Sequence, residues 1–103
     1  MTGPGGGFDP AIHAPARLRI MAVLASVGEG EFALLRETTG VSDSVLSKHL
    51  SALGEAGYVR LRKAAQDGRQ RTWAALTRQG RQAFCAHVEA LQALTAVADG
   101  LAE

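Results

Sequence analysis

Cysteine, aromatic residues and long apolar runs are all scarce in this sequence. Its single cysteine, Cys85, has no second cysteine with which to form an internal disulfide, which is typical of proteins in a reducing compartment. No apolar run approaches the roughly 20 residues that span a bilayer. The N-terminal sequence MTGPGGGF lacks the charged-then-apolar order of a signal peptide. We therefore expect a cytoplasmic protein that makes no membrane contact.

Length and composition predict one small domain. With 103 residues, 47% of them hydrophobic and only 5% aromatic, the chain can bury one modest and largely aliphatic core. The glycine-rich start is low in complexity. We expect a flexible tail over residues 1–7, a folded domain over residues 8–98 and a C-terminal tail over residues 99–103.

Catalytic and metal-binding motifs are missing from the sequence. It has no nucleophile elbow, no phosphate-cradling glycine loop and no usefully spaced pair of carboxylates. Cys85 and His87 are two residues apart, so on a helix they would point about 200° from each other and need a partner chain to share an ion. We expect no enzyme activity, no metal site and no cofactor. Two sensing roles stay open: oxidation of Cys85, and a pH response of His13 and His87 meeting across an interface.

The segment from Ser42 to Val59 has the features of a well-delimited helix followed by a strand. The Ser42 hydroxyl can accept a hydrogen bond from a free amide of the first turn, and Asp43 places negative charge at the positive end of the helix dipole. Gly57 readily adopts the left-handed conformation that ends a helix. We therefore predict a helix over residues 43–56, about four turns long.

This predicted helix has two contrasting faces. One is a narrow apolar stripe of Leu46, Leu50 and Leu53. The opposite face is short, polar and almost uncharged, and consists of Ser44, Ser47, Lys48 and Ser51. A helix that lies in the major groove of DNA needs short hydrogen-bonding side chains and no acidic ridge. The pattern favours a groove-binding helix; the alternative is a surface helix that happens to be rich in serine.

The net charge of +1 conceals a concentration of positive charge after this helix. Between Tyr58 and Arg81 there are seven basic residues against one acidic residue, which gives this segment a charge of +6 and leaves −5 for the rest of the chain. A local basic cluster of this kind is typical of a phosphate-binding surface on a small domain. An arginine-rich hairpin that is merely solvated is the alternative.

Two strands and a turn are predicted within the basic segment, at residues 58–63 and 72–77, with the turn at Asp67-Gly68 in the loop AAQDGRQR. Val59 and Leu61 alternate with arginines, so we expect both to face the core. We also expect Trp73 to be a core residue. Arginines near the tip of such a hairpin can enter a minor groove or pair with its phosphates.

The sequence before residue 42 predicts the first part of a helix-turn-helix unit. A core helix begins at Pro15 and is closed by Gly28, and a very short strand is predicted at residues 31–33. A compact helix then ends at Gly40. A glycine-containing turn between this helix and the capped helix completes the unit, with Val41 and Leu46 filling its inner corner.

The C-terminal segment predicts one long helix that Thr77 caps and that ends near Ala98. Its apolar stripe comprises Phe84, Val88, Leu91, Leu94 and Val97. Because little core is left for this stripe to cover, we expect it to pack against a second copy in a homodimer, with Phe84, Val88, Leu91 and Leu94 at the interface. A helix that folds back on its own monomer is the alternative.

Three blocks of sequence together carry a family resemblance: HAPARLRIMAVL, GVSDSVLSKHLSALGEAGYVRLRK and GRQRTWAALTRQGRQAF. Over residues 8–94 the chain resembles winged helix-turn-helix transcriptional regulators of the MarR/ArsR superfamily. The resemblance implies a mainly α fold with a small antiparallel β-hairpin, the wing, and terminal helices that form the dimer contact. ArsR-type metal sensors usually carry a cysteine pair before the turn, and residues 33–39 contain no cysteine.

The hypothesis from sequence is a dimeric, sequence-specific regulator of double-stranded DNA, acting as a repressor at a palindromic operator. Helix 43–56 would enter the major groove and wing 62–72 would contact the flanking backbone and minor groove. The residues expected at DNA are Ser42, Ser44, Val45, Ser47, Lys48, Ser51, Arg62, Lys63, Arg69 and Arg71. The alternative is a winged-helix protein-interaction module. A small-molecule effector between the terminal helices and the DNA-binding unit stays open.

Overall fold

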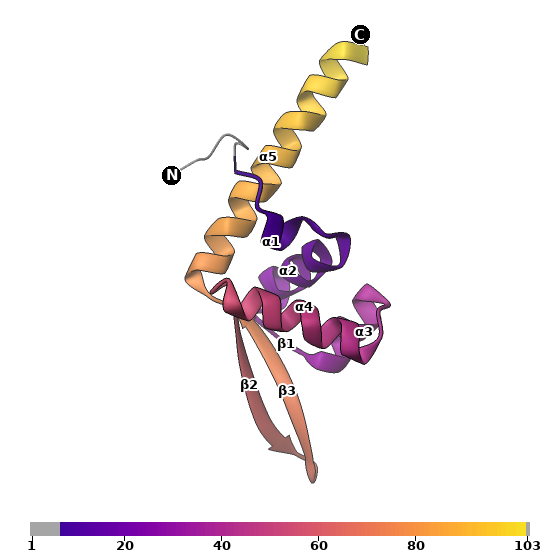
Figure 1. The fold of residues 1–103 in the computed structure, drawn as a ribbon, viewed down its shortest axis with the longest axis vertical. Coiled ribbons are helices and arrows are strands. Elements are labelled where there is room, and N and C mark those ends of the chain that lie inside the picture. The colour runs from indigo at the N-terminus through magenta and orange to yellow at the C-terminus, as the bar shows by residue number, and fades with distance from the viewer. Residues whose placement is uncertain (1–6, 103) are drawn as a thin grey trace.

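The computed structural model describes residues 7–102 and contains five helices and three strands within that range. The elements are, in order, α1 (Pro10–His13), α2 (Pro15–Val27), β1 (Glu29–Glu31), α3 (Phe32–Thr39), α4 (Asp43–Glu55), β2 (Val59–Gln66), β3 (Arg69–Leu76) and α5 (Arg78–Ala102). The fold is mainly helical with a small antiparallel sheet, as the sequence predicts (Figure 1). The tail expected over residues 1–7 lies outside the described residues except for Gly7.

The predicted helix-turn-helix unit is formed by α3, a short turn and α4. Gly40 ends α3 with a φ of 71°, a left-handed conformation that costs glycine little. Ser42 then caps α4 by accepting a hydrogen bond from the Val45 amide at 3.3 Å. Val41 packs against the core and Leu46 is fully buried, so the inner corner is filled as expected.

The three strands form one antiparallel sheet in the order β1-β3-β2. The short strand lies at Glu29–Glu31, two residues before its predicted position, because Phe32 and Ala33 already belong to α3. The hairpin is also longer than predicted, since β2 and β3 pair as far as Gln66 and Arg69. Asp67 and Gly68 have φ values of 53° and 75°, and a two-residue turn with positive φ at both positions matches the twist of paired strands.

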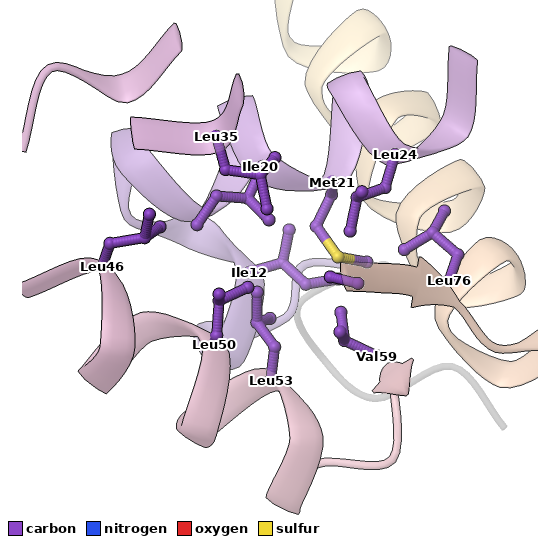
Figure 2. Close-up of a cluster of buried hydrophobic side chains, with 11 residues drawn as sticks. Ile12, Ile20, Met21, Leu24, Leu35, Leu46, Leu50, Leu53, Val59 and Leu76 are labelled. Atoms are coloured by element: carbon purple, nitrogen blue, oxygen red, sulfur yellow. The ribbon is translucent and has the colours of Figure 1, made fainter. Parts of the chain in front are cut away.

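A single aliphatic core lies between the helices and the sheet (Figure 2). The leucine stripe of α4 meets buried side chains of the first helices and of the two long strands, which are Ile12, Ile20, Met21, Leu24, Leu35, Val59 and Leu76. Two expectations about burial are wrong. Leu61 is 43% exposed on the edge strand β2, and Trp73 is only half-buried.

Helix α5 begins in the core and ends far from it. Thr77 caps it by accepting a hydrogen bond from the Gly80 amide at 2.9 Å, as predicted, and the first turns pack on α2 and β3. The helix continues to Ala102, beyond the predicted end near Ala98, and its distal half projects away from the other helices (Figure 1). Over residues 7–102, no helix is both long enough and apolar enough to cross a membrane.

Candidate nucleic-acid interface

The exposed face of α4 is the first part of the candidate interface. Leu46, Leu50 and Leu53 are 0%, 2% and 0% exposed, so the predicted apolar stripe is buried. The four side chains predicted on the other face are all exposed: Ser44, Ser47, Lys48 and Ser51. The structure therefore presents three hydroxyls and one ammonium along one outward ridge, with the length and chemistry that base edges in a major groove require.

Neighbouring side chains of α4 complete this face or support it. Ser42 and Val45 are also exposed, and the Ser42 hydroxyl lies 3.3 Å from that of Ser44. Asp43, the one acidic residue of the first turn, is neutralised by an ion pair of 3.0 Å with Arg36 of α3. The face is therefore free of uncompensated negative charge near its N-terminus.

His49 lies between the two faces of α4 and serves the packing of the domain. Its Nδ1 accepts a hydrogen bond from Arg17 Nε at 3.0 Å, and Arg17 also donates to the Ala11 carbonyl at 3.1 Å. Burial, followed by the nearby charge of Arg17, lowers the pKa of His49. This neutral histidine ties α4 to α2.

The wing is the second part of the candidate interface, and its basic residues divide between the two faces of the sheet. Lys63 pairs with Thr72 and lies on the same face as Val59, whose side chain reaches the core. Arg62, Arg69 and Arg71 lie on the opposite, outer face. Arg69 and Lys63 are exposed, whereas Arg71 is half-buried.

Two of these cations already have carboxylate partners within the chain. Arg62 donates from Nε and Nη2 to the two carboxylate oxygens of Glu29, at 3.0 and 2.8 Å, and its guanidinium lies 5.6 Å from the centre of the Trp73 ring. Arg71 donates from Nη1 to Glu31 at 2.6 Å. The hydrogen bond to Arg62 holds the pKa of Glu29 below its usual value, so this pair stays charged at neutral pH.

Glu29 and Glu31 belong to this surface and were not among the residues predicted there. A signal for them was present, because two glutamates that alternate with a glycine place both carboxylates on one face of a short strand. Their partners could not be predicted from the sequence, since Glu29 is 33 residues from Arg62 and Glu31 is 40 residues from Arg71 along the chain.

The apolar stripe of α5 is partly buried near the start of the helix and exposed toward its end. Phe84 packs against the core of its own chain, and Val88 and Leu91 are half-buried. Leu94, Val97 and Leu101 are 56%, 61% and 83% exposed. The predicted dimer residues thus lie on one helix, and the bare distal part of that helix projects from the domain (Figure 1).

His13 and His87 meet within one chain, not across an interface as suggested from the sequence. Nδ1 of fully buried His87 accepts the backbone N–H of Asp9 at 3.0 Å, so the neutral ring carries its proton on Nε2, 3.4 Å from Nδ1 of His13. Burial and then the charge of His13 lower the pKa of His87. Asp9 also accepts from the Tyr58 hydroxyl, which ties the N-terminal segment to the start of the wing.

Side chains suited to metal binding do not gather in the described part of the chain. No cluster of three or more metal-ligating side chains occurs within residues 7–102. Cys85 is exposed on α5, whereas His87 points inward and is buried, so the two do not converge.

A helix-turn-helix unit followed by a basic two-stranded hairpin defines a winged helix domain. The comparison with known proteins agrees, and the chain belongs to the family described as winged helix DNA-binding domain, whose profile matches residues 16–95. The uncharacterized protein MJ0432 of Methanocaldococcus jannaschii is 36% identical over 72 residues, which are 70% of this chain and 78% of that protein.

Two solved structures show the same fold. A transcriptional regulator homologue from Pyrococcus horikoshii OT3 superposes with a TM-score of 0.76 at 27% identity, over 88% of this chain and 87% of that chain. HlyU from Vibrio cholerae N16961 superposes with a TM-score of 0.61 at 28% identity, over 72% of this chain and 76% of that chain. The resemblance to winged helix-turn-helix regulators is therefore confirmed for most of the chain.

Proposed function

We propose that this protein is a dimeric, sequence-specific transcriptional regulator of the MarR/ArsR type that represses by occupying a palindromic operator in the cytoplasm. The observation that carries the proposal is the exposed ridge of α4, where Ser44, Ser47, Lys48 and Ser51 face outward from a helix whose other side is anchored by three buried leucines. In this proposal α4 lies in the major groove and these side chains contact base edges.

The wing supplies the contacts that do not depend on sequence. Lys63 and Arg69 are exposed and have no carboxylate partner among the described residues, so they are free to pair with phosphates or enter the minor groove. Arg62 and Arg71 lie on the outer face of the same hairpin, each in an ion pair with a glutamate of β1. The phosphate contacts of the wing set affinity and register, whereas the ridge of α4 selects the sequence.

The exposed apolar end of α5 supports the proposed dimer. An isolated monomer would hold Leu94, Val97 and Leu101 in water on a projecting helix, and burial against a second copy removes this apolar surface from solvent. A two-fold axis through the paired α5 helices would place two copies of α4 on half-sites of a palindrome. Occupation of such a site within a promoter excludes other proteins, which is repression by the simplest route.

A salt titration with random-sequence duplex tests the DNA-binding proposal. The logarithm of the association constant should fall steeply with the logarithm of salt concentration, by about 0.9 for each phosphate neutralised. Arg69→Ala should make this slope shallower by about 0.9, because it removes one phosphate contact. Arg81→Ala is the matched control, since it removes an exposed arginine from α5, at the opposite end of β3 from the wing tip.

Sequence preference is tested with duplexes selected from a random pool. Lys48→Ala and Ser44→Ala should change which bases are preferred, and each lost base contact should cost about 1–3 kcal/mol at the affected position. Arg69→Ala should weaken binding to all sites alike. If the wild-type protein binds no duplex even at low salt, the proposal is wrong and the basic hairpin serves a protein partner.

A further inference from the structure

Two glutamates of β1 occupy the guanidinium groups of two wing arginines. The Glu29 carboxylate accepts hydrogen bonds from both Nε and Nη2 of Arg62, at 3.0 and 2.8 Å. A phosphate would bind the guanidinium in the same bidentate geometry. Glu31 accepts a hydrogen bond from Nη1 of Arg71 at 2.6 Å. The winged-helix function as proposed above assigns no role to either glutamate.

The sheet register places these carboxylates beside the arginines. Glu31 is opposite Trp73 on β3, and Trp73 is opposite Arg62 on β2, so the three side chains lie in one row on the outer face. Glu29 is two residues from Glu31 and lies on the same face. A three-residue edge strand that carries two carboxylates is thus laid along the basic face of the wing.

The second pair also borders a hollow in the surface. A cavity of about 290 Å³ opens there, lined by Glu31, Phe32, Ala33, Arg69, Gln70, Arg71 and Thr72. The positive charges of Arg69 and Arg71 would attract an anion into this space, and the negative charge of Glu31 would repel the same anion. Nε of Arg71 is buried and has no hydrogen-bond partner among the described residues, so Glu31 does not satisfy the whole guanidinium.

We propose that Glu29 and Glu31 are specificity-determining residues, which occupy Arg62 and Arg71 and so lower the affinity for duplexes of arbitrary sequence. Each carboxylate competes with phosphate for the same donors and adds negative charge beside the backbone. Binding to a random duplex then depends on Arg69 and Lys63, while the ridge of α4 is left to discriminate between sites. The inference rests on the proposed DNA-binding function and names two residues that oppose binding within it.

The two pairs are accessible enough for the competition to occur. The side chains of Arg62 and Glu29 are 51% and 40% exposed, and those of Arg71 and Glu31 are 31% and 25% exposed. The exposed Arg62–Glu29 pair contributes little to folding. Glutamine keeps an oxygen that can accept a hydrogen bond from Arg71, so Glu31→Gln should also leave the domain folded. The effect of the glutamates should therefore be visible in DNA binding and not in stability.

The test compares Glu29→Gln, Glu31→Gln and the double variant on a random-sequence duplex and on a duplex selected by the wild-type protein. The double variant should bind the random duplex more tightly, and its salt slope should steepen by up to about 1.8, the equivalent of two more phosphate contacts. The ratio of selected to random affinity should fall. Glu89→Gln is the matched control, because it removes the same charge from an exposed position on α5.

A mutant cycle then separates a local effect from a general change in charge. If Glu29 acts through Arg62, Glu29→Gln should change the salt slope in the wild-type background and leave it unchanged in Arg62→Ala. Weaker random-duplex binding by the double variant, or a slope equal to that of Glu89→Gln, would overturn the inference. A wild-type protein that binds no duplex would instead overturn the proposed function, so the two failures are distinguishable.

Discussion

Gly80, in the first turns of α5, is the position at which one added methyl group should disturb the domain most directly. A Cβ atom at this position would overlap the carbonyl oxygen of Tyr58 and would lie 2.8 Å from its carbonyl carbon and 2.9 Å from its Cα. All three atoms belong to the backbone, so no change of rotamer can relieve the overlap. Gly80→Ala therefore forces α5 or the start of the wing to move.

The backbone around Tyr58 is held too firmly to move without loss. Its amide donates to Leu53 at 2.9 Å, and its carbonyl accepts from the Thr77 amide at 3.0 Å. The Thr77 hydroxyl also donates to the Gly57 carbonyl at 2.6 Å. Any shift that accommodates the methyl group weakens these hydrogen bonds, which join α4, the wing and α5.

The expected net effect of Gly80→Ala is a loss of about 2 kcal/mol in the free energy of unfolding. Overpacking costs about 3 kcal/mol at its usual upper limit, and the helix preference of alanine over glycine returns about 1 kcal/mol. A loss of this size should lower the melting temperature by about 10 °C in a domain of this length. Thermal and urea unfolding followed by circular dichroism measure both quantities.

Gly100→Ala provides the matched control for this experiment. It makes the same change in the same helix, where an added Cβ would meet no other atom within 4 Å. Here only the helix preference acts, and stability should rise by up to about 1 kcal/mol. If Gly80→Ala is as stable as Gly100→Ala, the close approach of α5 to Tyr58 is wrong, and with it the direction in which α5 leaves the domain.

Two further predictions concern protonation. The hydrogen bond to Asp9, followed by burial, raises the pKa of Tyr58 to about 12, so the tyrosinate absorbance of this single tyrosine should develop at a pH well above the ordinary pKa of 10.0. Asp9→Ala should bring the pKa back toward 10.0. An unshifted titration of the wild-type protein would contradict the contact. The pKa of His87 in the folded protein is lowered from 6.5, so the unfolded chain binds more protons than the folded chain as the pH drops below 6.5. The free energy of unfolding should therefore fall with decreasing pH in this range, and it should fall less steeply in His87→Gln. Equal slopes for the two proteins would refute a buried neutral ring.

The helix-turn-helix unit could be predicted closely because its signals are local. Ser42 caps α4 within its own first turn, Gly40 and Gly57 end helices through their own φ angles, and the leucine spacing depends only on helix geometry. Each of these effects acts over a few residues, so sequence alone is sufficient to predict α4 and its two faces.

The wing was predicted less well because pairing decides where its strands end. Residues 64–66 carry no alternating apolar pattern, yet they pair with 69–71 once the Asp67-Gly68 turn brings the chains together. Leu61 follows the alternation and is still exposed on the edge strand β2, although Ala74, which is opposite it on β3, is buried. Periodicity shows which side chains lie on the same face of a strand. Only the packed structure shows which of them the core covers.

By itself the sequence determined the kind of domain, the helix that presents a serine ridge, and the basic hairpin that follows it, because capping, helical spacing and charge clustering are properties of short segments. The tertiary structure decided which charges meet. Sheet register sets Glu29 against Arg62 and Glu31 against Arg71, and the packing of α5 on the N-terminal segment joins His13 to His87. These contacts join residues 33 to 74 positions apart, and only the folded chain brings such residues within hydrogen-bonding distance.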